Sequence, residues 1–204
     1  MTQRAAITTD PGLKTLETIS PAKLIVNERP VTLFPVHDKA QIPPTIQLQM
    51  METMNYEIAK GDTYPRETLF TTLDEFLDYW VSHFCAVLVE GEPESLMQAT
   101  EFIGTFYIRP NYPDRSAHVC NAGFLVNPKK RGFRAGRLMG EQYVLWAPKL
   151  GYEYSVFNLV YETNVASCRI WDSLGFDRIG LIKGAGRLNG HDHRVDAIMY
   201  GKTL

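Results

Sequence analysis

The sequence predicts an α/β fold with a mixed sheet, and three patterns lead to this prediction. Short apolar runs bounded by Gly, Pro or polar residues recur between Pro30 and Tyr200, as is typical of buried strands. Two segments in the first half carry apolar residues at helical spacing. In the second half, further helical segments alternate with strands, which favours an α/β architecture.

The first elements are one strand and two helices. The strand is PVTLFPV at 30–36, and a helix follows at 45–60, where Gly61 can end it. The second helix begins with a capping-box pattern, Thr72 followed by Glu75. The expected apolar faces of the two helices are Ile46, Met50, Met54 and Ile58, then Leu73, Phe76, Leu77, Trp80 and Phe84.

The remaining elements alternate more regularly. They are strands at 84–89, 103–109 and 118–126, a helix over about 132–150, a strand at 154–161, a helix at 165–174, and strands at 176–182 and 195–200. Residues 1–22 are polar and contain Pro11, Gly12 and Pro21, so we expect a loose N-terminal arm there. Residues 23–204 then form a single domain of ordinary size.

Composition and charge exclude several classes of protein. The net charge of −2 argues against a nucleic-acid binder, and no apolar run approaches the length of a membrane span. Three distant cysteines fit neither a disulfide framework nor a zinc site. Because no secretory signal is present, we expect a cytoplasmic protein; Arg4 and several Thr near the start leave a mitochondrial fraction open.

The segment NAGFLVNPKKRGFRAGRLM, at 121–139, runs from a strand through a basic turn into a helix. A helix N-terminus offers free N–H groups and partial positive charge, and glycines let a pyrophosphate approach that backbone. Neither GxxxxGK[ST] nor GxGxxG is present, so a P-loop and a dinucleotide fold are set aside. The alternative is a surface turn with solvated charges. The charged residues are Lys129, Lys130, Arg131 and Arg134.

This loop resembles the acetyl-CoA loop of the GCN5-related N-acetyltransferase family, R/Q-x-x-G-x-G/A, which usually follows V-x-P. Here VNP at 126–128 precedes the loop, and Arg131 and Gly136 occupy its first and last positions. Arg134 replaces the middle glycine. The family's next signature, N-x-x-A-x-x-x-Y-x-x-x-G-F, is similar to 164–176, with Ser167 for Ala and Trp171 for Tyr.

Longer runs resemble a narrower group in that family, the fungal L-azetidine-2-carboxylate N-acetyltransferases. They are GTFYIRPNY, CNAGFLVN, LGYEYSVFNLVYETN, IWDSLGF and VDAIMYGK, with TYP at 63–65 and DYW at 78–80. The resemblance implies a mixed, mostly antiparallel sheet with helices on both faces and a splayed pair of parallel strands. It also implies acetyl-CoA as co-substrate, a small cyclic imino acid as acceptor, and no metal.

The biological expectations also rest on this resemblance. The acceptor would be L-azetidine-2-carboxylate, 4-hydroxyproline or a proline-pathway intermediate, and the role would be detoxification of proline analogues and protection from oxidative stress. We expect a homodimer with no nucleic-acid or membrane partner.

The resemblance further implies which residues hold acetyl-CoA. The pantetheine arm would pair with the open strand edge at 123–126, and the N–H of Phe124 would donate to the acetyl carbonyl. Trp171 cannot supply a proton where the family uses Tyr, so Asn164 is the expected donor to the thioester sulfur. Its alternative role is a helix N-cap. The full set is Phe124, Leu125, Val126, Arg131, Gly132, Phe133, Arg134, Ala135, Gly136 and Asn164.

Two asparagines interrupt apolar strands, where Asn is disfavoured. The resemblance makes Asn121 a substrate ligand and places the backbone of Asn158 and Leu159 at the substrate carboxylate. Buried, satisfied amides or a bulge are the alternatives. No general base stands out, although Glu162 and His118 are candidates by location.

Other interpretations remain open at this point. His191-Asp192-His193 is a metal-like trio, but its turn-forming surroundings favour a solvated hairpin. The acceptor could be a polyamine, another amino acid or a protein N-terminus, although no acidic cluster in the C-terminal half suits a polycation. A non-catalytic CoA-binding module is favoured by Arg134 and Trp171.

Overall fold

The computed structural model describes residues 17–132 and 134–204. One mixed sheet has the strand order β1-β2-β3-β4-β5-β6-β8-β7, and only β5 and β6 run parallel. The strands are β1 Ala22–Val26, β2 Arg29–Val36, β3 Phe84–Glu90, β4 Phe102–Pro110, β5 Val119–Val126, β6 Tyr154–Tyr161, β7 Asp177–Gly186 and β8 Val195–Thr203. The helices are α1 Pro44–Lys60, α2 Leu73–Trp80, α3 Ala135–Trp146 and α4 Val165–Ser173.

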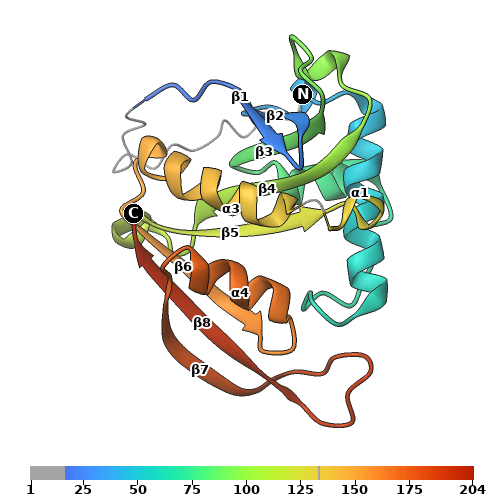
Figure 1. The fold of residues 1–204 in the computed structure, drawn as a ribbon. Coiled ribbons are helices and arrows are strands. Elements are labelled where there is room, and N and C mark those ends of the chain that lie inside the picture. The colour runs from blue at the N-terminus through green and yellow to red at the C-terminus, as the bar shows by residue number, and fades with distance from the viewer. Residues whose placement is uncertain (1–16, 133) are drawn as a thin grey trace, which may run out of the picture.

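Helices cover both faces of the sheet, so the predicted α/β fold is confirmed (Figure 1). One core cluster joins α3 and α4 to the sheet, and the other joins α1 and α2 to its opposite face. Strand β3 contributes to both, because Ala86 and Leu88 face the first cluster while Val87 and Val89 face the second. A strand that is buried on both faces has a continuous apolar sequence, such as FCAVLV at 84–89.

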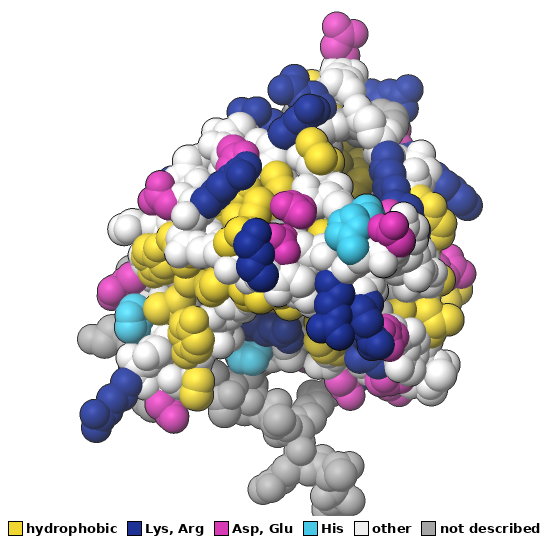
Figure 2. Space-filling model, turned by 90° about the horizontal axis from the view of Figure 1, so that it is seen from below, with side chains coloured by type: hydrophobic (Ala, Val, Ile, Leu, Met, Phe, Trp, Pro, Cys, Tyr) yellow, Lys and Arg dark blue, Asp and Glu magenta, His cyan; other side chains and the backbone are white. Residues whose placement is uncertain are grey.

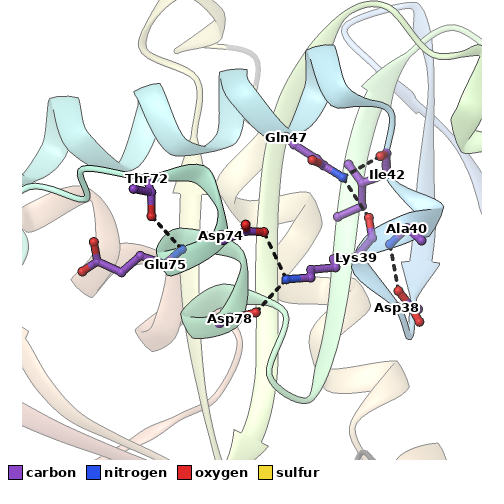
Figure 3. Close-up of polar contacts among 9 residues, drawn as sticks. All are labelled: Asp38, Lys39, Ala40, Ile42, Gln47, Thr72, Asp74, Glu75 and Asp78. Carbon is purple, nitrogen blue, oxygen red and sulfur yellow. Dashed lines mark hydrogen bonds and ion pairs between the residues drawn. The ribbon is translucent and has the colours of Figure 1, made fainter. Parts of the chain in front are cut away.

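The layer of α1 and α2 is fixed at its start by polar contacts (Figure 3). Lys39 Nζ lies 3.3 Å from a carboxylate oxygen of Asp74 and 2.8 Å from one of Asp78, both on α2. Gln47, on α1, donates its side-chain amide to the carbonyl of Lys39 at 2.9 Å. These contacts hold α2 against the N-terminal turn of α1, and α2 carries Tyr79 toward the site described below.

The predicted start of α2 is confirmed in part. Thr72 Oγ1 accepts from the N–H of Glu75 at 3.2 Å, which is half of the capping box. The Glu75 carboxylate instead accepts from the N–H of Thr71 at 3.4 Å. Phe84, which was expected on the apolar face of this helix, belongs to β3.

The main differences from the sequence prediction are one missed strand and the two ends of one helix. Strand β1 was missed; it forms a hairpin with β2 through Asn27 and Glu28, whose positive φ angles of 48° and 65° suit a tight I′-like turn. Helix α3 begins at Ala135 rather than near 132, because Arg134 has a left-handed φ of 58°. It ends at Trp146, and a separate 3₁₀ turn starting at Pro148 follows.

The N-terminal arm and the single domain over 23–204 stay predictions. Most of the arm, residues 1–16, and Phe133 lie outside the described residues. Within the described ranges, no helix combines the length and apolar character needed to cross a membrane.

The parallel strands β5 and β6 separate soon after they start. Only two residue pairs join them, Val119 with Tyr154 and Cys120 with Ser155. Beyond these pairs the strands diverge, as Figure 1 shows, and helices α3 and α4 begin shortly after the strands end. The predicted splayed pair is therefore confirmed, and the positive ends of two helix dipoles lie at its open end.

Candidate active site

Two cavities meet in the gap between β5 and β6. The larger one has a volume of about 1160 Å³, and the smaller one about 320 Å³. Both are lined by Thr63, Tyr64, Phe124 and Asn164. Two different ligands can therefore reach the same point from separate cavities, as transfer of a group between them requires.

The hydrogen-bonding pattern between β4 and β5 determines which backbone groups of β5 face this gap. The N–H of Asn127 donates to the carbonyl of Ile103 at 2.9 Å, and the N–H of Asn111 donates to that of Val119 at 2.8 Å. In an antiparallel pair, residues alternate between those that bond to the partner and those that face away. The odd-numbered residues of β5 therefore bond to β4, and the even-numbered ones turn their backbone toward β6.

Phe124 and Val126 are among the even-numbered residues, and no β6 residue pairs with them. Their N–H and carbonyl groups form an open strand edge inside the larger cavity. The ring of Phe124 packs in the core, with its centroid 5.0 Å from that of Trp171 and 5.3 Å from that of Phe106. The partly buried ring, packed against these aromatic residues, helps to fix the position of a backbone donor that remains available to a ligand.

The larger cavity gathers nearly all the residues that the sequence assigned to acetyl-CoA. Phe133 is the exception, since it lies outside the described residues. The lining residues from that set are Phe124, Leu125, Val126, Arg131, Gly132, Arg134, Ala135, Gly136 and Asn164.

The basic loop is less free than its composition suggests. Lys130 Nζ lies 2.7 Å from Glu90 and 3.3 Å from Glu101, and its hydrogen bond to Glu90 raises the pKa of the ammonium group. Arg131 forms an ion pair with Glu57 of α1. Arg134 has no ion pair with a carboxylate of the described residues, and it lines the cavity at the N-terminus of α3.

Other cationic residues at the larger cavity were missed from the sequence. They lie on α1, α3 and α4 and come together only through the fold. They are Lys60, Arg137 and Arg169, with His191 beside them. On the face seen in Figure 2, basic side chains are interspersed with acidic and apolar ones.

Asn164 combines both roles considered for it. Its Oδ1 accepts from the N–H of Ser167 at 3.2 Å, so it is the N-cap of α4. Its Nδ2 makes no hydrogen bond with the described part of the chain, and the residue lines both cavities. The indole N–H of Trp171 donates to Ser167 Oγ at 2.9 Å, so the Asn164 amide, rather than this indole, has a free donor here.

The smaller cavity contains the predicted acceptor residues Asn121, Asn158 and Leu159. Asn121 Nδ2 donates to the carbonyl of Val156 at 3.0 Å, just beyond the last β5–β6 pair, so the side chain replaces a backbone bond where the strands separate. Asn158 and Leu159 have no partner on β8, because the register shifts there. The bulge considered from the sequence is present and leaves their backbone outside the β6–β8 ladder.

Four tyrosines, among them Tyr161 at the end of β6, and one arginine also line this cavity, and the sequence analysis assigned none of them a role. The hydroxyls of Tyr64 and Tyr79 share a hydrogen bond of 2.7 Å. Burial raises the pKa of Tyr64 and of Tyr107 far above the ordinary range, so both phenols stay protonated at neutral pH. Arg109 lies over the rings of Tyr107 and Tyr79.

No residue lining the smaller cavity is Asp, Glu or His, as far as the described residues extend. The candidate bases Glu162 and His118 line neither cavity. No described group of three His, Cys, Asp or Glu side chains could hold a metal ion. His193 Nδ1 lies 2.8 Å from Asp192, and both are exposed in the loop between β7 and β8.

Comparison with known proteins agrees with this arrangement. The model of the acetyltransferase (GNAT) family matches residues 51–176. N-acetyltransferase aca1 of Schizosaccharomyces pombe is 44% identical over 158 residues, which cover 72% of this chain and 75% of that protein.

Two further proteins show how far the similarity extends. Protein SPT10 of Saccharomyces cerevisiae is 32% identical over a 217-residue alignment that covers 85% of this chain but 34% of that protein. The structure of a GNAT superfamily phosphinothricin acetyltransferase from Sinorhizobium meliloti, in complex with acetyl-CoA, has a TM-score of 0.67 at 16% identity and covers 84% of this chain and 88% of that chain. The chain therefore belongs to the GNAT family of acetyltransferases.

Proposed function

We propose that this protein transfers an acetyl group from acetyl-CoA to the ring nitrogen of a small cyclic imino acid, with L-azetidine-2-carboxylate as the acceptor. The observation that carries the proposal is the meeting of two cavities at Phe124 and Asn164. The larger is suited to a long, phosphorylated thioester, and the smaller to a compact amine.

The larger cavity fits acetyl-CoA in its chemistry. Its lining includes the N-terminus of α3 and several Lys and Arg side chains, which suit a pyrophosphate. The open edge of β5 at Phe124 and Val126 can pair with the amide groups of a pantetheine arm, as an added strand would. This pairing brings the thioester to the shared part of the two cavities.

The reaction follows from the groups at that point. The neutral amine attacks the acetyl carbon, and the carbonyl oxygen becomes an oxyanion that accepts from the N–H of Phe124. Collapse of this intermediate breaks the carbon–sulfur bond, and the Asn164 amide donates to the departing thiolate. The nitrogen releases its proton to water, since no carboxylate or imidazole of the described residues lines the smaller cavity.

The smaller cavity supports a compact acceptor. Its volume of about 320 Å³ is at the lower end for small-molecule sites. Asn121 and the backbone of Asn158 and Leu159 offer polar groups, and aromatic rings supply the remaining walls. We assign Asn121 as a ligand of the acceptor and the 158–159 backbone to the acceptor's carboxylate.

A thiol-release assay tests this function. Acetyl-CoA is incubated with the protein and, separately, L-azetidine-2-carboxylate, 4-hydroxyproline, a polyamine, and a peptide with a free N-terminus. We expect release of CoA thiol with the imino acids, and an N-acetylated product detected by mass spectrometry. Release with the polyamine or the peptide alone would contradict the proposed acceptor, and no release with any amine would favour a non-catalytic CoA-binding module.

The proposed role is detoxification of proline analogues and protection from oxidative stress. The homodimer, the cytoplasmic location and the absence of a metal also belong to this proposal. Size-exclusion chromatography with light scattering tests the dimer.

A further inference from the structure

We propose that the side chain of Arg109 binds the carboxylate of the acceptor and makes the enzyme select amines that carry one. The inference rests on the proposed function and deepens it, because it assigns acceptor specificity to a residue outside the predicted site. It follows from the position of the guanidinium group, its lack of a counterion, and its neighbours.

Arg109 lies near the end of β4, on the wall of the smaller cavity. In the strand register it is paired with Asn121, so the two side chains are neighbours on one face of the sheet. Its guanidinium carbon lies 4.5 Å from the ring centroid of Tyr107 and 5.2 Å from that of Tyr79. The aromatic faces hold the positive charge beside the cavity rather than in bulk water.

No described Asp or Glu forms an ion pair with Arg109, and no acidic side chain of the described residues lines this cavity. The positive charge influences its surroundings. Burial, and then the charge of Arg109, lower the pKa of His83. A half-buried guanidinium without an anionic partner is poorly compensated, and a ligand carboxylate would complete it through two parallel hydrogen bonds.

The bulge on β6 lies on the same wall. Asn111, two residues beyond Arg109 along the chain, exchanges side-chain amide hydrogen bonds of 2.6 and 3.3 Å with Asn158. Asn111 lies just past the end of β4, and Arg109, Asn158 and Leu159 line the same cavity. A carboxylate held by Arg109 therefore also lies near the unpaired backbone of 158–159. A polycationic acceptor would instead bring positive charge against Arg109.

The test pairs each acceptor with its carboxamide, which keeps the amine and the size but removes the negative charge. For L-azetidine-2-carboxylate and for L-proline, kcat/KM is measured against the matching carboxamide in the wild type, Arg109→Gln and Arg109→Lys. We expect the wild type to prefer the carboxylates by about tenfold to a hundredfold, as a charge-assisted contact allows. Arg109→Gln should abolish this preference by raising the KM for the carboxylate. Arg109→Lys should keep part of the preference.

Arg115→Gln is the matched control, because Arg115 is exposed and lines neither cavity. The KM for acetyl-CoA and the melting temperature show whether each variant is folded. If Arg109→Gln keeps the carboxylate preference in a folded protein, the inference is wrong. If the wild type prefers another amino carboxylate over azetidine-2-carboxylate, only the proposed acceptor is contradicted. If the wild type acetylates azetidine-2-carboxylate and its carboxamide at equal rates, only the role of Arg109 is contradicted. No turnover with any acceptor would overturn both.

Discussion

The two cavities of this acetyltransferase differ in how they are built. The larger one depends on backbone: the open edge of β5 and the N-terminus of α3, surrounded by cationic side chains from several elements. The smaller one depends on side chains, with four tyrosines, Arg109 and Asn121 arranged around the gap in the sheet. A site built from backbone groups tolerates substitution of its side chains, but it is sensitive to changes in backbone shape and in local charge. A site built from side chains is sensitive to substitution of each of those side chains.

The same difference separates binding of the acetyl donor, which the whole family shares, from binding of the acceptor, which differs between members. A family of enzymes that shares one donor can keep one backbone site, because the donor never changes. The acceptor varies, and side chains on α2, β4 and the 63–65 segment can vary with it without disturbing the β5 edge. The predictions below use substitutions that should affect one cavity and leave the other intact.

The largest effect is expected for Gly136→Asp in the larger cavity. Gly136 lies in the first turn of α3, and a carboxylate there would repel a pyrophosphate and neutralise the positive end of the helix dipole that attracts it. The KM for acetyl-CoA should rise by about a hundredfold or more, about 2.7 kcal/mol, while the KM for the acceptor stays unchanged.

Gly136→Ala is the control for shape alone. An added Cβ would lie 3.3 Å from Ile170 Cδ1 and 3.8 Å from Val126 Cγ2, so small side-chain shifts can accommodate it. The Ala variant should raise the KM for acetyl-CoA by less than about tenfold. An unchanged affinity for acetyl-CoA in a folded Gly136→Asp protein would remove the phosphate site from this loop.

The second-largest effect is expected for substitutions of Asn164, which lines both cavities. Asn164→Ala should lower kcat by about tenfold to a hundredfold, because the leaving thiolate loses a donor, with little change in either KM. Asn164→Ser should lower kcat equally but preserve the N-cap, so that only the Ala variant loses about 1 kcal/mol of stability. A kcat within about threefold of wild type for both variants would leave Asn164 with the capping role alone.

A smaller effect, confined to the acceptor cavity, is expected for Asn121→Ala. The KM for the acceptor should rise about tenfold, because a contact made in both ground and transition states is lost. The KM for acetyl-CoA should not change. Asn158→Ala is the comparison, since its side chain bonds to Asn111 and its proposed contact is through backbone; it should change stability more than KM. A large loss of thermal stability in Asn121→Ala without a change in KM would make Asn121 structural.

The smallest effect is expected for Arg134→Gly, which restores the glycine of the family loop. Arg134 has a left-handed φ of 58°, a conformation that costs a non-glycine residue about 1–2 kcal/mol. Glycine removes that strain but increases the entropy of the unfolded chain, so the free energy of unfolding should change little. The KM for acetyl-CoA should stay within about tenfold of wild type. A larger rise would show that the Arg134 side chain itself binds the phosphates.

The sequence analysis named a larger share of the residues that line the larger cavity than of those that line the smaller one, for a physical reason. The loop at 129–136 and the β5 edge are nearly contiguous in the chain, so strand, turn and helix signals locate them together. The start of α3 was misplaced because a left-handed Arg134 has no sequence signal comparable to glycine or asparagine.

The acceptor cavity could not be assembled in the same way. Separate segments of the chain contribute Tyr64, Tyr79 and Tyr107. In the sequence, each of them is indistinguishable from an ordinary aromatic residue of a hydrophobic core. Arg109 ends the predicted strand at 103–109, where the sequence alone indicates a solvated side chain. Only the pairing of β4 with β5, and the packing of α2 on the same face, bring these side chains together.

Two structures of the protein, one with acetyl-CoA and one with CoA and L-azetidine-2-carboxylate, test the central claim most directly. We predict that the pyrophosphate lies at the N-terminus of α3, and that the acetyl carbonyl accepts from the N–H of Phe124 at about 2.7–3.2 Å. The acceptor nitrogen should lie in the smaller cavity, facing the position of the acetyl carbon. Acetyl-CoA bound away from the β5 edge, or an acceptor bound outside the cavity lined by Arg109 and Asn121, would contradict the account.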